Sequence, residues 1–375
     1  MNRVKRFIYR DSDVSSALIA ILMGLLVGLI ILLVSSPGQA LFGFVSILTG
    51  GFSSPKAFGS VLYLATPIIM TGLSVGFANK TGLFNIGAPG QFIVGAYAAV
   101  LIGNYCAFLP GPTLWIAALI GAVIAGAVWG ALPGLLKAYR NVNEVISCIM
   151  MNYIGMYMVN YLIRLTVFDS LKNQSRRVAS AANLPKLGLD QLFAGSSANS
   201  GILIAILAGI AIYIILEKTK FGYELKAVGY NRFASMYAGV NEKRAILYSM
   251  LIAGALSGLG GALLYLAGSG KGIDVVDVLA TEGFNGIPVA LLGLSNPIGI
   301  IFSGLFIAYL TQGGFDMQLY NFAPQVIQII IAVIIYFSAL ALLVKEVLLY
   351  FRKRSELKSG LKPGGGNTRA GGDAS

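Results

Sequence analysis

Long apolar segments recur along this 375-residue chain, and they constrain its fold more than any other feature. About 20 apolar residues are needed for a helix to cross the hydrocarbon core of a bilayer. Only 11% of the residues are charged, against about 25% in an average soluble domain, which excludes a soluble globular enzyme. The pattern predicts an all-α, polytopic bundle of transmembrane helices. The apolar runs occupy residues 17–34, 57–78, 86–103, 113–136, 145–165, 201–216, 245–268 and 323–344.

A further apolar stretch, residues 286–310, is interrupted by glycines and by Pro297 and counts as two crossings, which gives about ten. Ten crossings place both termini on one side of the membrane. With the N-terminus inside, 20 of the 27 basic residues lie in inside segments, and the net charge is +11 inside and +1 outside. Because cytoplasmic loops are enriched in Lys and Arg, both ends are predicted to be cytoplasmic. Segment 41–52 is interpreted as an interfacial or re-entrant helix, since an extra crossing there would invert the later loops.

This topology divides the chain into three parts. Residues 1–16 form a cytoplasmic N-terminus, residues 17–344 form the transmembrane domain, and residues 345–375 form a Gly-rich tail that is predicted to be disordered and cytoplasmic. With no His and only two cysteines, the chain lacks the ligands for a zinc cluster. The Gly-rich residues 268–272 are superficially similar to a phosphate-binding loop. That motif requires a Ser or Thr after its Lys, whereas Gly follows Lys271 here. We therefore expect no metal, cofactor or nucleotide site on this chain, and an energy source on another chain or in an ion gradient.

The longest inside connection, residues 217–244, has a sequence unlike that of a linker. Asn231 is a favoured N-cap residue, and Gly239 suits the left-handed position at which a helix ends. Between them Phe233, Tyr237 and Val240 are spaced as one apolar stripe. The spacing predicts a short amphipathic helix, either packed on the bundle and the lipid headgroups or inserted into a groove of a cytoplasmic partner.

This loop resembles the coupling loop of ABC importer permeases of the ribose, branched-chain amino acid and nucleoside type. Residues 82–91 (GLFNIGAPGQ) are similar to a further signature of these permeases, although Pro89 stands where the family more often has Glu. Residues 143–154 and 283–293 are similar to segments of the nucleoside, or simple-sugar, branch. The coupling-loop pattern falls on Gly222, Lys226, Ala227, Gly229, Asn231, Ala234 and Gly239.

The resemblance implies the permease subunit of a bacterial ABC importer in the cell (inner or plasma) membrane, which is not itself an enzyme. It implies a cytoplasmic ATPase that carries ATP and Mg, a second homologous permease subunit and an extracytoplasmic substrate-binding lipoprotein. A nucleoside or related riboside is the implied substrate, with a simple sugar as the alternative. An ion-coupled transporter is less favoured, because the middles of the spans lack ionisable residues. The residues expected to dock the ATPase are Asn231, Arg232, Phe233, Tyr237 and Gly239.

Uncharged polar residues inside the apolar spans are candidates for the substrate path. Asn85 and Gln91 flank a helix start, where free N–H groups are also present, and they either shape that start or line the path. Asn152 and Asn160 are eight residues apart and so share one helix face, either for interhelical hydrogen bonds or for a polar ligand. The full set of candidates is Phe84, Asn85, Gln91, Asn152, Tyr153, Asn160 and Asn285.

The dipeptide Phe-Asn occurs at 84–85 and again at 284–285, each time before a Gly-rich membrane segment. In the predicted topology the first segment runs outward and the second inward. Ten crossings divide into two halves of five, and an odd number reverses direction. An inverted five-helix repeat is therefore a hypothesis for this chain.

Overall fold

The computed structural model describes residues 19 and 21–339, and the chain divides into two compact units. Among the described residues the smaller unit holds residues 19, 21–28 and 332–339, where Gly24 lies against the backbone of Ile334. The larger unit, residues 29–331, carries the loops and helices discussed below. The predicted N-terminal segment 1–16, the end of the last apolar run (340–344) and the predicted tail 345–375 lie outside the described residues.

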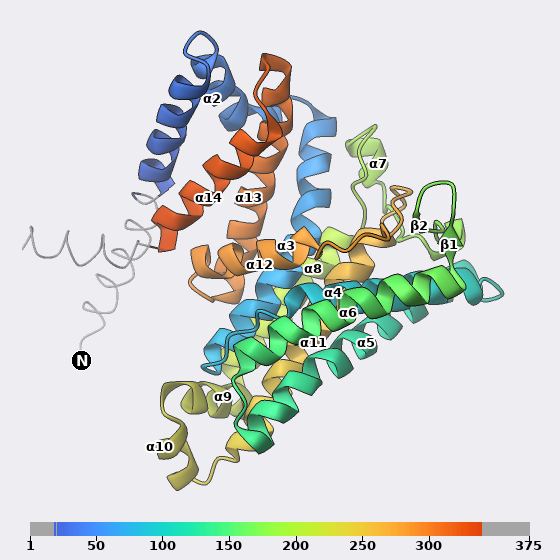
Figure 1. Cartoon of the computed structure of the whole chain (residues 1–375), viewed down its shortest axis with the longest axis vertical. Helices are drawn as coiled ribbons and strands as arrows, with labels where there is room; N and C mark the ends of the chain where they lie inside the picture. Colours follow the sequence, from blue (N-terminus) through green and yellow to red (C-terminus); the bar gives the residue numbers. More distant parts are fainter. Residues whose placement is uncertain (1–18, 20, 340–375) are drawn as a thin grey trace, which may run out of the picture. The chain divides into compact units, whose positions relative to one another are not determined.

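The described chain is built mainly of α-helices (Figure 1). An apolar helix at Ile21–Ser35 precedes the labelled elements. The α-helices are α2 (Ala40–Thr49), α3 (Pro55–Lys80), α4 (Ala88–Tyr105), α5 (Gly111–Arg140), α6 (Glu144–Thr166), α7 (Leu189–Leu192), α8 (Gly201–Lys218), α9 (Lys220–Tyr230), α10 (Arg232–Tyr237), α11 (Glu242–Tyr265), α12 (Thr281–Leu292), α13 (Pro297–Met317) and α14 (Pro324–Ala339). Three 3₁₀ turns, η1 (Gly50–Phe52), η2 (Ser180–Ala182) and η3 (Gln318–Tyr320), and two short strands, β1 (Phe168–Asp169) and β2 (Gln174–Ser175), complete them.

Six of the described helices are long and apolar enough to cross a membrane: α3, α5, α6, α8, α11 and α13. Over its described residues, each apolar run of the sequence coincides with a helix, so the prediction of an α-helical membrane bundle is confirmed at this level. The Gly- and Pro-broken stretch separates into α12 and α13, and Pro297 is the first residue of α13 because its fixed φ and missing N–H suit a helix start. Segment 41–52 is helical as α2 and η1.

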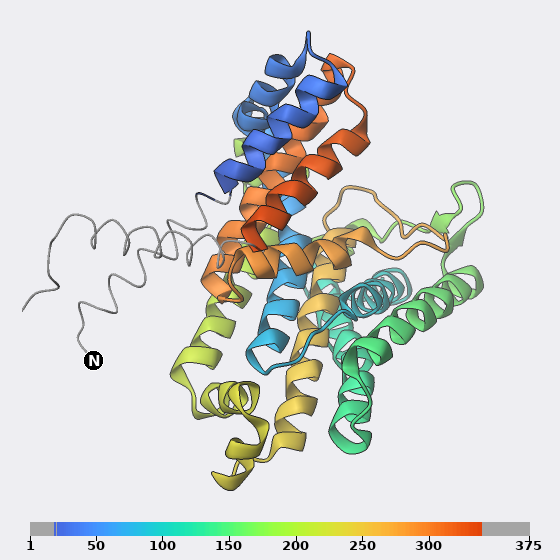
Figure 2. The same ribbon diagram turned by 60° about the vertical axis from the view of Figure 1, so that its left-hand side comes forward.

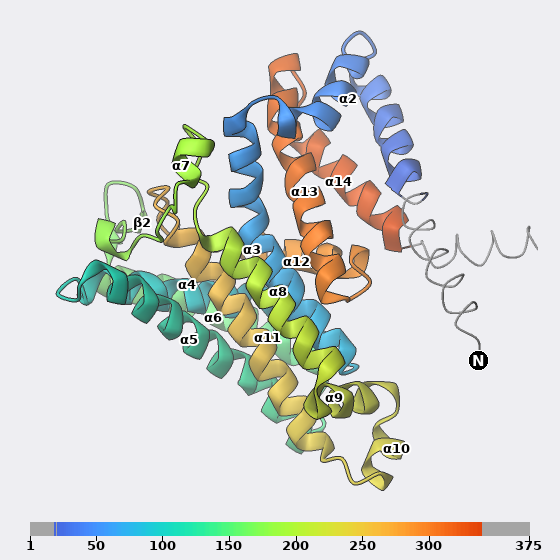
Figure 3. The same cartoon turned by 180° about the vertical axis from the view of Figure 1, so that it is seen from behind.

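Helices α3 and α11 form the centre of the larger unit (Figures 2 and 3). They contact each other, α3 packs on α12 and α13, and α11 packs on α4 and α5. Small residues allow the closest of these approaches: a Cβ added to Gly254 of α11 would lie 3.0 Å from the Cα of Gly130 in α5. In a membrane the hydrophobic effect does not drive helices together, because lipid tails are as apolar as the helices. Close packing of small residues drives their association instead.

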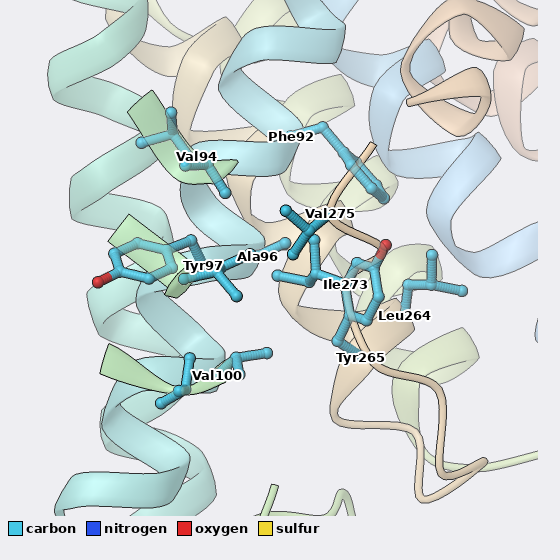
Figure 4. Packing of buried hydrophobic residues seen from close by; sticks show 12 residues of the cluster. Phe92, Val94, Ala96, Tyr97, Val100, Leu264, Tyr265, Ile273 and Val275 are labelled. Carbon is cyan, nitrogen blue, oxygen red and sulfur yellow. The ribbon is translucent and has the colours of Figure 1, made fainter. Parts of the chain in front are cut away.

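A hydrophobic cluster joins α4, α6 and α11 to the segment that follows α11 (Figure 4). Phe92 and Val100 of α4 and Tyr265 at the end of α11 belong to it, as do Ile273 and Val275 from the connecting segment. The β1–β2 hairpin reaches the same segment, where the backbone N–H of Ser175 donates to the carbonyl of Ile273 at 2.8 Å. The loops at this end of the bundle are therefore packed together rather than free.

Candidate functional site

The predicted docking loop folds into two short helices, α9 and α10, which follow α8 (Figure 3). The Thr219 hydroxyl caps α9 by accepting from the backbone N–H of Gly222 at 3.1 Å. Lys226 of α9 forms an ion pair with Glu217 at the end of α8, with 3.0 Å between Nζ and Oε1. Helix α9 is thus fixed to the membrane helix that precedes it.

Gly229 brings the end of α9 against the turn that follows α3. A Cβ at this position would lie 2.5 Å from the carbonyl oxygen of Lys80 and 2.9 Å from the backbone nitrogen of Gly82. Only Gly allows the two backbones to approach so closely. Gly229 of the coupling-loop pattern is therefore needed for the packing of α9 on the turn after α3.

Helix α10 is the short helix that the sequence predicts between Asn231 and Gly239. The Asn231 side chain accepts from the backbone N–H of Ala234 at 2.9 Å, as an N-cap does. Gly239 has φ +81°, the left-handed conformation that ends a helix. The helix ends at Tyr237, so Val240 lies beyond it, and the predicted three-residue stripe reduces to Phe233 and Tyr237.

Arg232, the first residue of α10, points back to the bundle. Its guanidinium donates to both carboxylate oxygens of Glu242, with 2.8 Å between Nη2 and Oε1, and to the Asn141 side chain at 3.3 Å. These hydrogen bonds to Glu242 raise the pKa of Arg232 further above its usual value. The paired guanidinium ties α10 to the start of α11 and to the turn between α5 and α6.

The two aromatic side chains of α10 point into solvent. Phe233 is 72% exposed and Tyr237 is 95% exposed, so neither ring packs on the chain's own helices. Exposed aromatic rings on a short, well-anchored helix form an apolar surface that is available to a partner or to lipid headgroups.

Asn85 and Gln91 are brought together in the turn that precedes α4. The two side-chain amides exchange hydrogen bonds of 2.8 and 3.0 Å, and Asn85 also donates to the Ser74 hydroxyl at 3.0 Å. Both amides are buried, at 0% and 1% exposed. Asn85 accepts from the Gly87 backbone but is not the N-cap, which is Gly87. Within the single chain these groups hold the start of α4 and face no open space.

Asn152 of α6 is buried against the same helix start. Its side chain accepts from the backbone N–H of Gly90 at 2.9 Å and donates to the carbonyl of Ile86 at 2.9 Å. It therefore satisfies one of the free N–H groups of α4. The three side chains Asn85, Gln91 and Asn152 thus lie together at the first turn of α4, where they form hydrogen bonds.

The remaining candidates are dispersed. Asn160, on the buried face of α6, donates to the carbonyl of Val276 at 2.9 Å and to the Asp277 carboxylate at 3.0 Å. Tyr153 lies on the neighbouring face of α6 and is 46% exposed, and Asn285 is exposed on α12. Phe84 is half-buried beside the α4 start.

Two kinds of residue were not predicted from the sequence: hydrogen-bond partners of the candidate residues, and further tyrosines on the same helix as Tyr153. Ser74 and Glu242 carry no local signal, because their partners Asn85 and Arg232 meet them only through the fold. Tyr157 and Tyr161 do carry one: they follow Tyr153 at intervals of four residues, the spacing that places residues on one helix face. Extending the face of Tyr153 by two steps of four residues would have found both.

The apolar helices and their buried polar contacts define a multi-pass membrane protein. The chain belongs to the family described as "Branched-chain amino acid transport system / permease component", whose model matches residues 57–339.

Three relatives extend along most of the chain. A guanosine ABC transporter permease protein of Bacillus subtilis is 39% identical over 92% of this chain and 98% of its own. A nucleoside ABC transporter permease protein of Lactococcus lactis is 33% identical over 88% of this chain and 92% of its own. A glucose ABC transporter permease protein of Haloferax volcanii is 32% identical over 78% of each chain. The sequence-based resemblance to ABC permeases, closest to the nucleoside branch, is thereby confirmed.

Proposed function

We propose that this chain is a permease subunit of a bacterial ABC importer of nucleosides or related ribosides in the cell membrane. It forms part of the translocation path together with a second permease subunit, and an extracytoplasmic lipoprotein delivers the substrate. A cytoplasmic ATPase that binds ATP and Mg supplies the energy. The observation that carries the substrate class is the similarity to guanosine and nucleoside permease proteins along nearly the whole chain.

The geometry of α10 supports docking of the ATPase at this helix. Phe233 and Tyr237 offer an apolar surface, Arg232 fixes the helix to the bundle, and the Asn231 cap stabilises the start of the helix. An amphipathic helix that places its apolar face in a groove is a recurring mode of recognition, and aromatic side chains often carry most of the binding energy. Gly239 sets the exit of the chain toward α11.

The contacts of the loops support the predicted topology of ten crossings with both termini inside. At one end, predicted inside segments meet: α9 packs on the turn after α3, and Arg232 reaches Asn141. At the other end, predicted outside segments meet: Gln174 bridges to Asp274, and the N–H of Leu184 donates to the carbonyl of Leu266. In each of these contacts, both loops are assigned to the same side of the membrane.

The packing of the central helices supports the inverted-repeat hypothesis. Helix α3 packs on α12 and α13, and α11 packs on α4 and α5. The two helices after α11 thus pack on α3, and the two helices after α3 pack on α11. Two halves related by a repeat would show such a reciprocal arrangement. The two Gly-rich segments also meet, since a Cβ on Gly283 would lie 2.9 Å from the Cβ of Pro89.

A simple sugar is the second candidate substrate, favoured by the similarity to the glucose permease protein. Both substrate classes need neutral hydrogen-bonding groups. They differ in the nucleobase, an aromatic ring that a sugar lacks. An ion-coupled mechanism has no specific support.

Competition uptake tests the proposal. Cells with and without this chain are given labelled guanosine in the presence of excess unlabelled nucleosides or glucose. We expect uptake that depends on the chain and is competed by nucleosides. Chain-dependent uptake of labelled glucose without chain-dependent uptake of labelled guanosine would assign the sugar, and uptake that survives inactivation of the partner ATPase would rule out the ABC mechanism.

Docking is tested by Tyr237→Asp and Phe233→Asp, with co-purification of the ATPase and uptake as readouts. Leu171→Asp is a matched control, because Leu171 is also 95% exposed but lies in the β1–β2 connection. We expect both α10 variants to lose the ATPase while the control retains it. Retention of ATPase and uptake in both α10 variants would show that the docking assignment is wrong.

A further inference from the structure

The exposed side of α6 carries three tyrosines next to the exposed aliphatic residues Met150 and Ile154. Tyr153, Tyr157 and Tyr161, called here the tyrosine ladder, are 46%, 55% and 64% exposed. They are spaced by four residues and extend over about 12 Å of helix at 1.5 Å per residue. Helix α6 lies at the front of Figure 1.

Two neighbouring membrane helices show what a lipid-facing surface of this chain looks like. The exposed residues of α5 include Ile116, Ile120, Ile124 and Val128, which are entirely aliphatic. Those of α8 are Leu203, Leu207, Ile210 and Ile214. Hydrocarbon side chains are expected where a helix meets lipid tails, because polar groups there cost free energy.

The tyrosine ladder does not fit a lipid-facing surface. Tyr153 and Tyr157 flank Gly155, the middle residue of α6, whereas membrane proteins concentrate Tyr at the two interfaces. A hydroxyl without a partner is costly in hydrocarbon. Tyr97 and Tyr105 each bond Thr166, yet none of the ladder hydroxyls bonds to another described residue.

The neighbouring, buried face of α6 shows that polar side chains of this helix can find hydrogen-bond partners within the fold. Asn152 and Asn160 are buried there and each makes two hydrogen bonds to neighbouring segments. The ladder therefore carries the polar groups of α6 that require a partner from outside the chain.

We propose that the tyrosine ladder of α6 borders a water-filled substrate path and that its rings and hydroxyls contact the nucleoside as it passes. This inference rests on the proposed function for the substrate class. A phenol combines an aromatic face with a hydroxyl group, and a nucleoside carries an aromatic base and sugar hydroxyls, so both parts of the side chain have a complementary group. Stacking on aromatic side chains tolerates different bases, which suits an importer of several nucleosides.

Thiol labelling tests the water-filled path directly. Tyr157→Cys is introduced into the full transporter carrying Cys106→Ser, with Ile124→Cys on α5 as the matched lipid-facing control. Cys148 is buried and remains. A small anionic methanethiosulfonate reagent is applied with and without guanosine. We expect labelling of Tyr157→Cys that guanosine reduces, and no labelling of Ile124→Cys above the parent chain.

Two labelling results would overturn the proposal. Equal, background labelling of both variants would place the ladder in lipid. Labelling of Tyr157→Cys that guanosine leaves unchanged would show that the face is in contact with water but not with the substrate.

Uptake kinetics separate the ring from the hydroxyl. Loss of a stacking ring in Tyr157→Leu is expected to raise the apparent KM for guanosine about tenfold, whereas Tyr157→Phe keeps the ring and changes KM less. Unchanged KM in Tyr157→Leu and Tyr161→Leu would overturn substrate contact. Absence of guanosine uptake by the unmodified transporter would instead refute the proposed function, and the labelling of Tyr157→Cys would still report whether the ladder faces water.

Discussion

Asn85 and Gln91 exchange two hydrogen bonds across the turn that precedes α4, and both amides are almost fully buried. Each amide is the principal partner of the other. Removal of Gln91 leaves one amide hydrogen of Asn85 without a partner, although Asn85 keeps its bonds to Ser74 and Gly87, and removal of Asn85 leaves the whole Gln91 amide without one. A buried polar group without a partner costs about 1–3 kcal/mol. This pairing makes the two residues a single structural unit rather than two independent polar groups.

The first prediction concerns this pair. We expect Gln91→Leu to lower the thermal stability of the purified protein, and Asn85→Leu/Gln91→Leu to recover part of the loss because fewer orphaned amides remain. Gln191→Leu, on the exposed helix α7, serves as control and should change stability by no more than about 0.5 kcal/mol. Thermal unfolding in detergent measures all three. Normal stability of Gln91→Leu combined with lost uptake would instead place the amide in the substrate path.

The second prediction concerns the ion pair of Arg232 and Glu242. The pair is partly exposed, so Arg232→Ala should change the free energy of unfolding by less than about 1 kcal/mol. It should nevertheless reduce ATPase co-purification and uptake, because α10 loses its tether to α11. The charge exchange Arg232→Glu/Glu242→Arg should restore part of both.

Lys220→Ala is the control for that experiment. Lys220 forms an exposed pair with Glu224 inside α9, 3.7 Å apart, and tethers no second helix. Its loss should leave ATPase co-purification unchanged. If Arg232→Ala and Lys220→Ala behave alike, the tether does not position α10.

The sequence predicts those parts of the fold that follow from local patterns. Apolar run length locates the membrane helices, because lipid imposes a minimum length on any crossing helix. The bounds of α10 follow from Asn231 and Gly239, since capping chemistry is decided by adjacent residues. Pro297 marks the start of α13 for the same reason.

Partners brought together by tertiary packing could not be predicted. Asn160 bonds Asp277, 117 residues further along the chain. The face of α6 on which Asn152 and Asn160 lie together follows from helical period, but whether that face is buried depends on neighbouring helices. For this reason the sequence left open whether these amides pack or line a path.

The third prediction concerns the contact between α9 and the turn after α3. A Cβ at Gly229 would fall 2.5 Å from a backbone oxygen, which cannot move aside as a flexible side chain can. Overpacking of this kind costs about 1–3 kcal/mol, so Gly229→Ala should reduce stability and ATPase co-purification. Gly38→Ala, where an added Cβ meets nothing within 4 Å, is the control. Equal stability of the two variants would show that α9 adjusts freely.

The last prediction concerns the loop between α11 and α12. Asn160 holds this loop to α6 through the Val276 carbonyl and the Asp277 carboxylate. Loss of hydrogen bonds to a charged group weakens local structure by about 1.5–3 kcal/mol, which corresponds to amide exchange about tenfold faster or more. In Asn160→Leu we therefore expect faster hydrogen exchange at the amides of Ile273 and Val275, which bond to the segment around β2. Asn104→Leu is the control.

The Asn104 side chain bonds only the Val100 carbonyl within its own helix, so its loss should leave exchange in the loop unchanged. In the proposed topology and function, substrate enters past the loops at this end of the bundle. A loosened loop should then change the apparent KM for uptake more than the amount of protein in the membrane. Protection of Ile273 and Val275 that is equal in Asn160→Leu and the unmodified protein would show that the β1–β2 hairpin and the cluster around Tyr265 hold the loop without the asparagine.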